Sequence, residues 1–217
     1  LVGSEMCIRD RLCRAQAELL LRSAEQVERA GFAVPMRHIC DSAGSEYYPE
    51  YHFDAVRLGR RLIMDHPTQP RGNVRECASW RSCIMAVHRR HAGEKLGYGG
   101  VYTLDHDADV AIVGVGYGDG LYLPLVEMHG DILVRGERRP MLACCMDQCM
   151  VDVSAVPQAK VGDTVTLIGR DGEDEITAAE IAGIMETIHY EVVCDISKRV
   201  TRVYLKNGKE VSVLDCI

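Results

Sequence analysis

A tyrosine set among glycines is the residue of this sequence best suited to moving a proton. Tyr98 lies between Gly97 and Gly99, and such glycines permit the backbone to approach a ligand closely. A free tyrosine hydroxyl is a weak acid, so it acts as a base only where its surroundings make it more acidic. Taken alone, such a tyrosine is more often an aromatic turn residue that packs on a strand.

A second group of residues has the chemistry of phosphate and ring-nitrogen binding. The hydroxyl of Ser42 and the backbone N–H of Gly59 are both suited to donate to phosphate oxygens. Arg57 keeps its proton under all ordinary conditions, so toward a ring nitrogen it acts only as a donor. Each of the three is also an ordinary turn or surface residue in many proteins, so none is strong evidence alone.

Several other polar clusters are better explained without a ligand. The glycine series from Gly114 to Gly120 lacks the spacing and the helix that dinucleotide binding needs. The cluster from Asp105 to Asp109 is typical of a solvated hairpin tip rather than a metal site. The 10 cysteines include no pair at C-x2-C spacing, so we expect reduced thiols and no metal.

Composition narrows the class of protein that positions these residues. The chain has 217 residues, of which 47% are hydrophobic and 26% charged, as in ordinary globular domains. Its net charge of −7 opposes binding to a nucleic-acid backbone. No apolar run approaches the roughly 20 residues that a membrane-spanning helix needs. We therefore expect a cytoplasmic protein that binds neither nucleic acid nor membrane.

The region that carries Ser42 and Arg57 should alternate helix and strand. Apolar residues at three- and four-residue steps predict an amphipathic helix from Ala15 to Gly31. Compact apolar runs at 36–40 and 55–64 predict two strands. This alternation is typical of α/β structure.

The region that carries Tyr98 should be mainly β, and a barrel suits its many short strands. Asn207-Gly208 is a strong signal for a type I′ hairpin turn. Thr177 with Glu180 predicts a capping box that begins a helix. The expected strands are Val110–Val115, Ile132–Arg135, Met141–Cys145, Met150–Val153, Thr164–Ile168, Arg202–Leu205 and Glu210–Leu214.

Breaks in these patterns suggest four segments. Residues 1–11 show no period, cap or turn logic and are expected to be a non-native or disordered leader. The run at 67–72 concentrates Pro and Gly between two different patterns, as a linker does. The sequence thus predicts an α/β part at 12–66 and a β domain at 73–217.

Motifs in series give the chain a resemblance to bacterial alanine racemases, which use pyridoxal phosphate. Any one of them is weak evidence, but together they cover about residues 15–214 in the family's order. The motifs are His38–Ala43 with Val56–Gly59, Gly97–Thr103 with Gly116–Gly120, Cys145–Asp152, and Thr187–Cys194.

The resemblance implies a fold and a reaction. In that family a (β/α)8 barrel holds the cofactor, and a C-terminal β domain reaches into the partner subunit's active site of a homodimer. Residues 12–66 would be the last barrel strands, and the intact enzyme would interconvert L- and D-alanine for cell-wall synthesis. None of the five lysines lies in the family's Schiff-base lysine motif, so the chain alone is expected to be inactive; they are Lys95, Lys160, Lys198, Lys206 and Lys209.

The resemblance also assigns roles to single residues. Racemisation needs acid/base groups on both faces of a planar cofactor–substrate adduct, and the match makes Tyr98 one of them. Arg57 matches the residue that meets the cofactor's pyridine nitrogen. The other matches are Ser42 and Gly59 for the cofactor phosphate, and Tyr117 and Met146, the latter through its backbone amide, for the amino acid substrate.

Two departures and two alternatives stay open on the sequence. Asp41 stands where the family more often has Asn, and Arg60 where a small apolar residue is common, so Arg60 either strengthens phosphate binding or projects into solvent. Lys198 follows a segment that approaches the phosphate in some relatives. A serine or broad-specificity racemase is the alternative enzyme, and a non-catalytic β-domain interaction module is the alternative of another class.

Overall fold

The computed structural model describes residues 10–59, 62, 76–128 and 130–215. The chain divides into two compact units, residues 1–77 and 78–217. The linker expected at 67–72, and all but the last two residues of the expected leader, lie outside the described residues. Within the described part, no helix is long and apolar enough to cross a membrane.

The first unit begins with the expected amphipathic helix, α1, which spans Asp10–Arg29. Ala17 and Ala24, two turns apart on one face, are its buried side chains. The helix ends where Gly31 adopts a left-handed conformation, with φ of 89°, and its N–H donates to the carbonyl of Glu28 at 2.9 Å. A glycine just past the last turn is a common helix stop.

Among the described residues of the two strands expected at 36–40 and 55–64, the structure has one isolated parallel bridge, between His38 and Ala55, in place of a regular strand pair. Around it, Asp54 N donates to Arg37 O at 3.0 Å, and Arg57 N donates to Cys40 O at 2.8 Å. The segments therefore run side by side without a regular ladder. A parallel strand pair has few hydrogen bonds of its own and is normally stabilised by neighbours on both sides.

The crossover between these segments carries two short helices. The helix α2 spans Ser42–Tyr47 and the 3-10 helix η1 spans Pro49–Tyr51. Asp41, the residue that departs from the family pattern, is the N-cap of α2, and its Oδ1 accepts from Gly44 N at 2.7 Å. The cap fixes the turn in which Ser42 lies.

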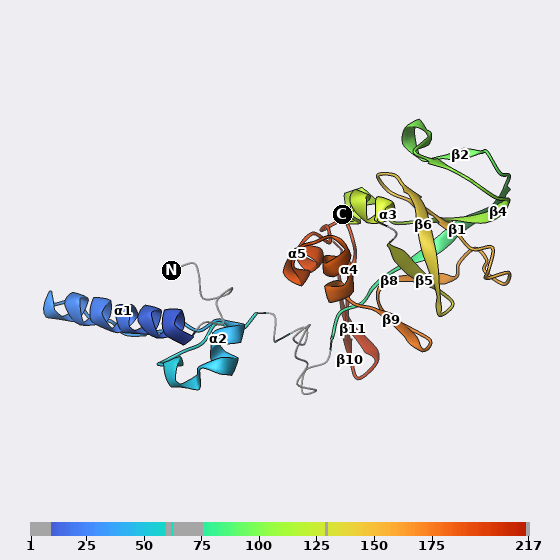
Figure 1. The fold of residues 1–217 in the computed structure, drawn as a ribbon. Coiled ribbons are helices and arrows are strands. Elements are labelled where there is room, and N and C mark those ends of the chain that lie inside the picture. The colour runs from blue at the N-terminus through green and yellow to red at the C-terminus, as the bar shows by residue number, and fades with distance from the viewer. Residues whose placement is uncertain (1–9, 60–61, 63–75, 129, 216–217) are drawn as a thin grey trace. The chain divides into compact units, whose positions relative to one another are not determined.

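The second unit is built on antiparallel strands that close into a ring (Figure 1). The strand order is β1-β4-β7-β6-β5-β8-β9, and β1 also pairs with β8, which closes six strands on themselves. The barrel arrangement that suited the sequence is thus present. The strands are β1 (Trp80–Arg90), β4 (Ala108–Val113), β5 (Asp131–Val134), β6 (Glu137–Cys144), β7 (Cys149–Asp152), β8 (Thr164–Asp171) and β9 (Asp174–Ile176).

Three short helices accompany the ring, and two of them pack against each other: α4 (Ala178–Ile184) and α5 (His189–Cys194). The third, α3 (Leu123–Glu127), follows the 3-10 helix η4 (Tyr117–Asp119). The largest fully buried side chains of the core include Ile84, Leu133 and Leu167, which come from three different strands. Burial of these branched residues inside the ring supplies most of the unit's stability.

Two smaller hairpins lie outside the ring (Figure 1). One consists of β2 (Lys95–Leu96), the 3-10 helix η3 (Tyr98–Gly100) and β3 (Tyr102–Thr103). The other consists of β10 (Arg202–Lys206) and β11 (Lys209–Leu214). Its turn residues Asn207 and Gly208 have φ of 54° and 74°, so the predicted type I′ geometry is confirmed.

Candidate functional site

The two residues expected to bind the cofactor phosphate meet in the first unit. Gly59 N donates to Ser42 Oγ at 3.2 Å, although the two residues lie 17 positions apart. Ser42 is buried at the start of α2, while Gly59 is exposed. The Ser42 hydroxyl could donate its own proton to an anion here, and the Gly59 amide could donate to the same anion once it leaves Ser42 Oγ.

Arg57 lies two residues before Gly59, on the segment that forms the bridge with His38. Its backbone N–H is held by Cys40, and its side chain is exposed. Arg57 thus lies at the same end of the bridged pair as Ser42 and Gly59. Arg60 lies outside the described residues.

In the second unit, Tyr98 lies in a turn between Gly97 and Gly99, and both glycines have a positive φ that favours glycine. Gly97 has φ of 75°, and a Cβ on it would lie 2.9 Å from Ala143 Cβ and from Val101 Cγ2. Gly99 has φ of 68° in open space. The turn therefore packs against β6 through Gly97 and leaves the Tyr98 side chain 62% exposed, so Tyr98 is not a core aromatic.

Tyr98 lines a cleft of about 450 Å³ in the second unit. Tyr117 lines the same cleft, so the structure brings together two of the site residues expected from the sequence. Apolar groups of α3 and β6 form much of the remaining wall, including Leu123, Val126 and Leu142. No lysine or arginine is among the residues that line it.

Tyr117 is tied to the segment that carries Met146. Tyr117 N donates to Cys145 O at 3.1 Å, and Gly118 N donates to Met146 O at 2.8 Å. A Cβ on Gly116 would lie 2.3 Å from Cys145 O, so only glycine allows this approach. Met146 is 51% exposed rather than buried in the core. The two residues expected at the substrate site are thus neighbours.

Asp119 anchors this turn from two sides. Its Oδ2 accepts from Gly116 N at 2.9 Å, and its Oδ1 pairs with Arg199 Nε at 3.5 Å. The first contact caps the turn. The second brings Arg199 beside the Tyr117 turn.

Three residues of the cleft were missed by the sequence analysis: Tyr102, His106 and Asp152. Tyr102 lies within the tyrosine motif and Asp152 closes the Cys145 motif, so both were quoted without a role. Tyr102 and Asp152 lie far apart in the chain and reach the same cleft because β4 pairs with β7. No local sequence signal could have predicted that they line one cleft.

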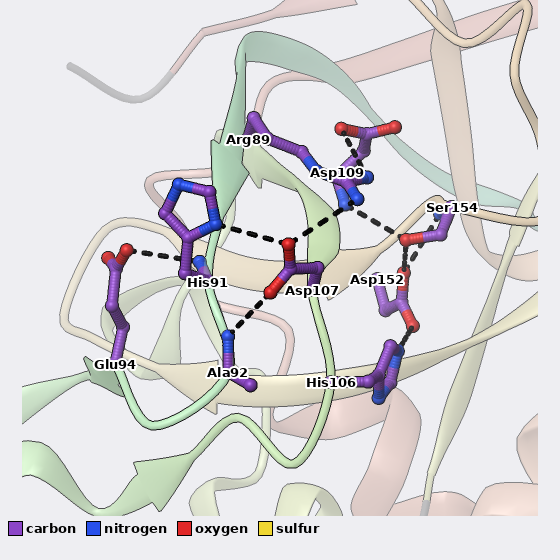
Figure 2. A network of polar contacts seen from close by, with 9 residues as sticks. All are labelled: Arg89, His91, Ala92, Glu94, His106, Asp107, Asp109, Asp152 and Ser154. Atoms are coloured by element: carbon purple, nitrogen blue, oxygen red, sulfur yellow. Dashed lines mark hydrogen bonds and ion pairs between the residues drawn. The ribbon is translucent and has the colours of Figure 1, made fainter.

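The cluster at Asp105–Asp109 is exposed, as expected for a hairpin tip, with the side chains of Asp105, His106 and Asp107 81%, 54% and 48% exposed, but its polar groups also contact one another and the strands beside them. His106 contacts Asp105. It also contacts Asp152, and Asp107 accepts from Ala92 N at 2.9 Å (Figure 2). These polar groups bond to one another and to the adjoining strands because the hairpin folds back on the ring. Among the residues that the structure describes, no group of three or more His, Cys, Asp or Glu is placed to hold a metal ion.

The cysteines beside the site are buried thiols. Burial raises the pKa of Cys144, which lines the cleft, to about 11, and it also raises the pKa of Cys149. Thiols of this kind stay protonated at neutral pH and are weak nucleophiles. The described cysteines beside the cleft are therefore poorly suited to act as nucleophiles at neutral pH.

Comparison with known proteins gives matches along most of the chain. The family model described as alanine racemase, C-terminal domain, matches residues 77–204. The chain is 33% identical over 193 residues to alanine racemase 1 of Clostridium acetobutylicum, covering 87% of this chain and 50% of that protein. It is 37% identical over 195 residues to the alanine racemase of Symbiobacterium thermophilum, covering 88% and 52%.

Solved structures agree with these matches. The alanine racemase of Bacillus anthracis with bound L-Ala-P has a TM-score of 0.89 and 27% identity, over 98% of this chain and 56% of that chain. The alanine racemase of Clostridium difficile in complex with cycloserine has a TM-score of 0.84 and 30% identity, over 96% and 56%. The chain spans about half the length of the relatives that it matches.

Proposed function

Because the chain belongs to the alanine racemase family, we propose that it supplies the C-terminal half of an isomerase that interconverts L- and D-alanine with pyridoxal phosphate in the cytoplasm. The observation that carries the proposal is the cleft in which Tyr98 and Tyr117 meet, beside the Met146 turn. A mainly β interaction module would have no chemical need for this arrangement together with the Ser42–Gly59 pair.

The first unit fits the cofactor that this function requires. The Ser42 hydroxyl offers a neutral donor that suits a phosphate, and the Gly59 amide, which donates to Ser42 Oγ in this structure, could turn to the same group. Among the described residues other than its chain neighbours, no atom lies within 4 Å of where a Gly59 Cβ would be. Arg57 would face the pyridine nitrogen as a donor, because a guanidinium has no acceptor. The cofactor, when bound, supplies the electron sink that makes the substrate's α-proton acidic.

The remaining features of the family are proposed on the same basis. The bridged parallel pair with its helical crossover supports the proposal that residues 12–66 are the last part of a (β/α)8 barrel. The exposure of Tyr98 supports a homodimer in which each β domain completes its partner's site. The substrate is a small amino acid, bound near Tyr117 and the backbone amide of Met146.

Within this reaction, Tyr98 would remove or return the α-proton on one face of the substrate. Its hydroxyl has no hydrogen-bond partner among the described residues, so it is available to a substrate. The glycines on either side hold the ring at the cleft without filling the space in front of it. A lysine from the other half of the enzyme would serve the opposite face.

Replacement of Tyr98 by Phe tests the proposal. In a chimera that joins this chain to the N-terminal half of a relative, we expect exchange of the α-proton of L-alanine with deuterated solvent to fall by about 100-fold or more. Exchange from D-alanine with retention should persist through the lysine. Proton NMR of each isomer in deuterated buffer measures both rates.

Tyr204→Phe is the matched control, because Tyr204 lies on the β10–β11 hairpin and does not line the cleft. That variant should exchange both isomers at the parent rates. Equal loss for both isomers in the Tyr98 variant, together with weaker cofactor binding, would show that Tyr98 is structural. The same assay with serine in place of alanine distinguishes the serine or broad-specificity alternative.

A further inference from the structure

Tyr98 is carried by a lobe, residues 91–107, that leaves the ring between β1 and β4. The lobe has a small internal ladder, in which Gly93 N donates to Leu104 O at 2.7 Å and Leu104 N donates to Glu94 O at 3.0 Å. A two-stranded hairpin of this size has little stability of its own. Leu96 and Leu104 of the lobe are buried in one cluster with Leu142 and Ala143 of β6. Polar contacts at the base of the lobe add to this packing in fixing where Tyr98 lies.

One set of contacts closes the base of the lobe on β1 and β4. Asp107 Oδ1 accepts from Ala92 N at 2.9 Å, while Asp107 Oδ2 contacts His91 Nδ1 at 3.1 Å (Figure 2). Arg89 pairs with Asp109 at 3.3 Å. All these side chains are substantially exposed, so each ion pair adds little. They join the two ends of the lobe but do not reach β7.

A second contact joins the lobe to β7, and it differs from the first set in that one partner is nearly buried: the side chain of Asp152 is 10% exposed, whereas those of His106 and Asp105 are 54% and 81% exposed. His106 Nδ1 lies 2.5 Å from Asp105 Oδ1, and its Nε2 lies 3.3 Å from Asp152 Oδ2. Both partners are carboxylates, which only accept hydrogen bonds. A neutral imidazole has one N–H, so it can donate to only one of them, whereas the imidazolium donates to both. The arrangement therefore selects the protonated ring.

Asp152 is a firm anchor for this contact. Its residue is 7% exposed, and Oδ1 accepts from Ser154 N at 2.8 Å and from Ser154 Oγ at 2.6 Å. Ser154 Oγ in turn accepts from Asp109 N at 2.9 Å (Figure 2). Because these bonds fix Oδ1, they also fix the orientation of the Asp152 carboxylate and the position of the Oδ2 atom that faces His106.

We propose that protonated His106 is a positioning residue, which holds the lobe carrying Tyr98 against β7 by bonding Asp105 and Asp152 at once. His106, Asp152, Tyr98 and Tyr102 line the same cleft, so release of the lobe changes the cleft itself. The proposal deepens the proposed function, on which its catalytic consequence rests.

The charges around His106 favour its protonated form. Asp105 lies on its own turn, Asp152 on β7, and Arg139 of β6 reaches Asp152 Oδ2 at 3.9 Å. The hydrogen bonds with Asp105 and then with Asp152 raise the pKa of His106. Burial raises the pKa of Tyr102, and the same two carboxylates raise it further, so this phenol adds no charge near neutrality.

The direction of the pH effect follows from this shift. Because the pKa of His106 is higher in the folded chain than the ordinary value of about 6.5, the double contact is complete below that value. As the pH rises through the raised pKa, the neutral ring keeps its one proton on Nδ1, toward the nearer carboxylate of Asp105, and the bond to Asp152, the one that reaches β7, is lost. The lobe is therefore held most firmly below about pH 6.5 and is loosened as the pH rises through the raised pKa of His106.

Hydrogen–deuterium exchange of the 217-residue chain tests the proposal without cofactor or substrate. Protection factors of the amides from Gly93 to Leu104 should fall as the pH rises from about 6 to 9, after correction for intrinsic exchange. In His106→Gln they should be about tenfold lower at the acidic end and change little with pH. NMR titration of the histidine ring protons should place the pKa of His106 above 6.5.

Two further variants separate positioning from general structure. His88→Gln removes an exposed histidine of β1 and should leave the exchange of the lobe unchanged. His106→Arg stays charged at all pH values and should keep the lobe protected on the alkaline side. In the chimeric racemase, His106→Gln should change the dependence of kcat on pH more than it changes the dependence of KM on pH.

Protection factors in the parent chain that stay constant over this pH range would overturn the proposal, as would a pKa of His106 below 6.5. These two readings need no variant, so poor folding of a variant leaves the test intact. Loss of the one-sided effect of Tyr98→Phe, with the exchange results as expected, would contradict the proposed function alone.

Discussion

Single residues of the first unit decide whether the Ser42–Gly59 contact is a phosphate site. Ser42→Ala removes one of the two donors that converge there and leaves the Gly59 amide without its acceptor. In the chimeric racemase we expect the Kd for pyridoxal phosphate to rise about tenfold, the worth of one hydrogen bond to a charged group. Fluorescence titration of the cofactor-free protein measures it.

Ser45→Ala is the matched control for this residue, because Ser45 Oγ donates only to the backbone carbonyl of Ser42, at 3.0 Å. Its effect on cofactor affinity should be small. Equal affinities for the Ser42 variant and the parent would remove Ser42 from the cofactor site.

A single methyl group tests how tightly the Tyr98 turn rests on β6. Gly97→Ala places a Cβ 2.9 Å from Ala143 Cβ at a φ of 75°, so it combines backbone strain with a collision. We expect a loss of about 2 kcal/mol in the free energy of unfolding of the second unit. Urea unfolding followed by fluorescence of Trp80, the one tryptophan of the chain, reports it.

Gly99→Ala isolates the strain from the collision, since Gly99 has φ of 68° but, among the described residues other than its chain neighbours, no atom within 4 Å of its Cβ position. This variant should cost about 1 kcal/mol, the penalty of the left-handed conformation alone. Identical losses for the two variants would mean that the lobe moves away from β6 without resistance.

At the scale of elements, the start of α4 offers a local test. Thr177 Oγ1 accepts from Glu180 N at 3.0 Å, as the predicted cap requires. Thr177→Ala should lower the free energy of unfolding by about 1 kcal/mol, and Thr177→Ser should restore most of it. The same Trp80 urea titration measures both, and equal midpoints for Ala and Ser would show that the cap contributes nothing.

The reciprocal half of this capping box is absent, which shows where local patterns stop predicting. The carboxylate of Glu180 bonds Arg138 of β6 instead of the backbone of Thr177. A guanidinium forms a stronger, charge-assisted bond than a backbone N–H. The sequence could predict the first contact because three residues separate its partners, but it could not predict a partner from a distant strand.

Other elements were not predicted because their sequences do not show the periodic pattern by which a helix or strand is recognised. Helices α3 and α5 have 5 and 6 residues, too few to display a helical period. Strand β1 is long but does not alternate, because its first part pairs with β8 and its last part with β4. By contrast, the turn at Asn207-Gly208 depends on two adjacent residues and was predicted correctly.

At the scale of the whole molecule, the site residues proposed from the family resemblance fall in two units of the chain. Ser42 and Arg57 belong to residues 1–77, whereas Tyr98, Tyr117 and Met146 belong to residues 78–217. The sequence motifs named both sets, because motif order reflects family membership rather than distance. In the proposed homodimer, the tyrosine of one subunit serves the cofactor held by the other.

Complementation between two inactive proteins tests this sharing. One chimera carries Tyr98→Phe, and the other lacks the cofactor lysine of the N-terminal half that it borrows. If Tyr98 acts across the subunit boundary, a mixed dimer has one site with both defects and one site with neither, so mixing after dissociation and reassociation should restore racemisation. If Tyr98 acts within its own subunit, every site keeps one defect, and the mixture stays inactive. Racemisation of L-alanine followed by polarimetry measures the recovery, and native mass spectrometry establishes that mixed dimers form. Mixed dimers without recovered activity would contradict the shared site even if the isotope exchange of the Tyr98 variant is one-sided. The two results depend on different properties of Tyr98. Isotope exchange reports which proton the phenol moves, whereas complementation reports in which subunit's site the phenol acts.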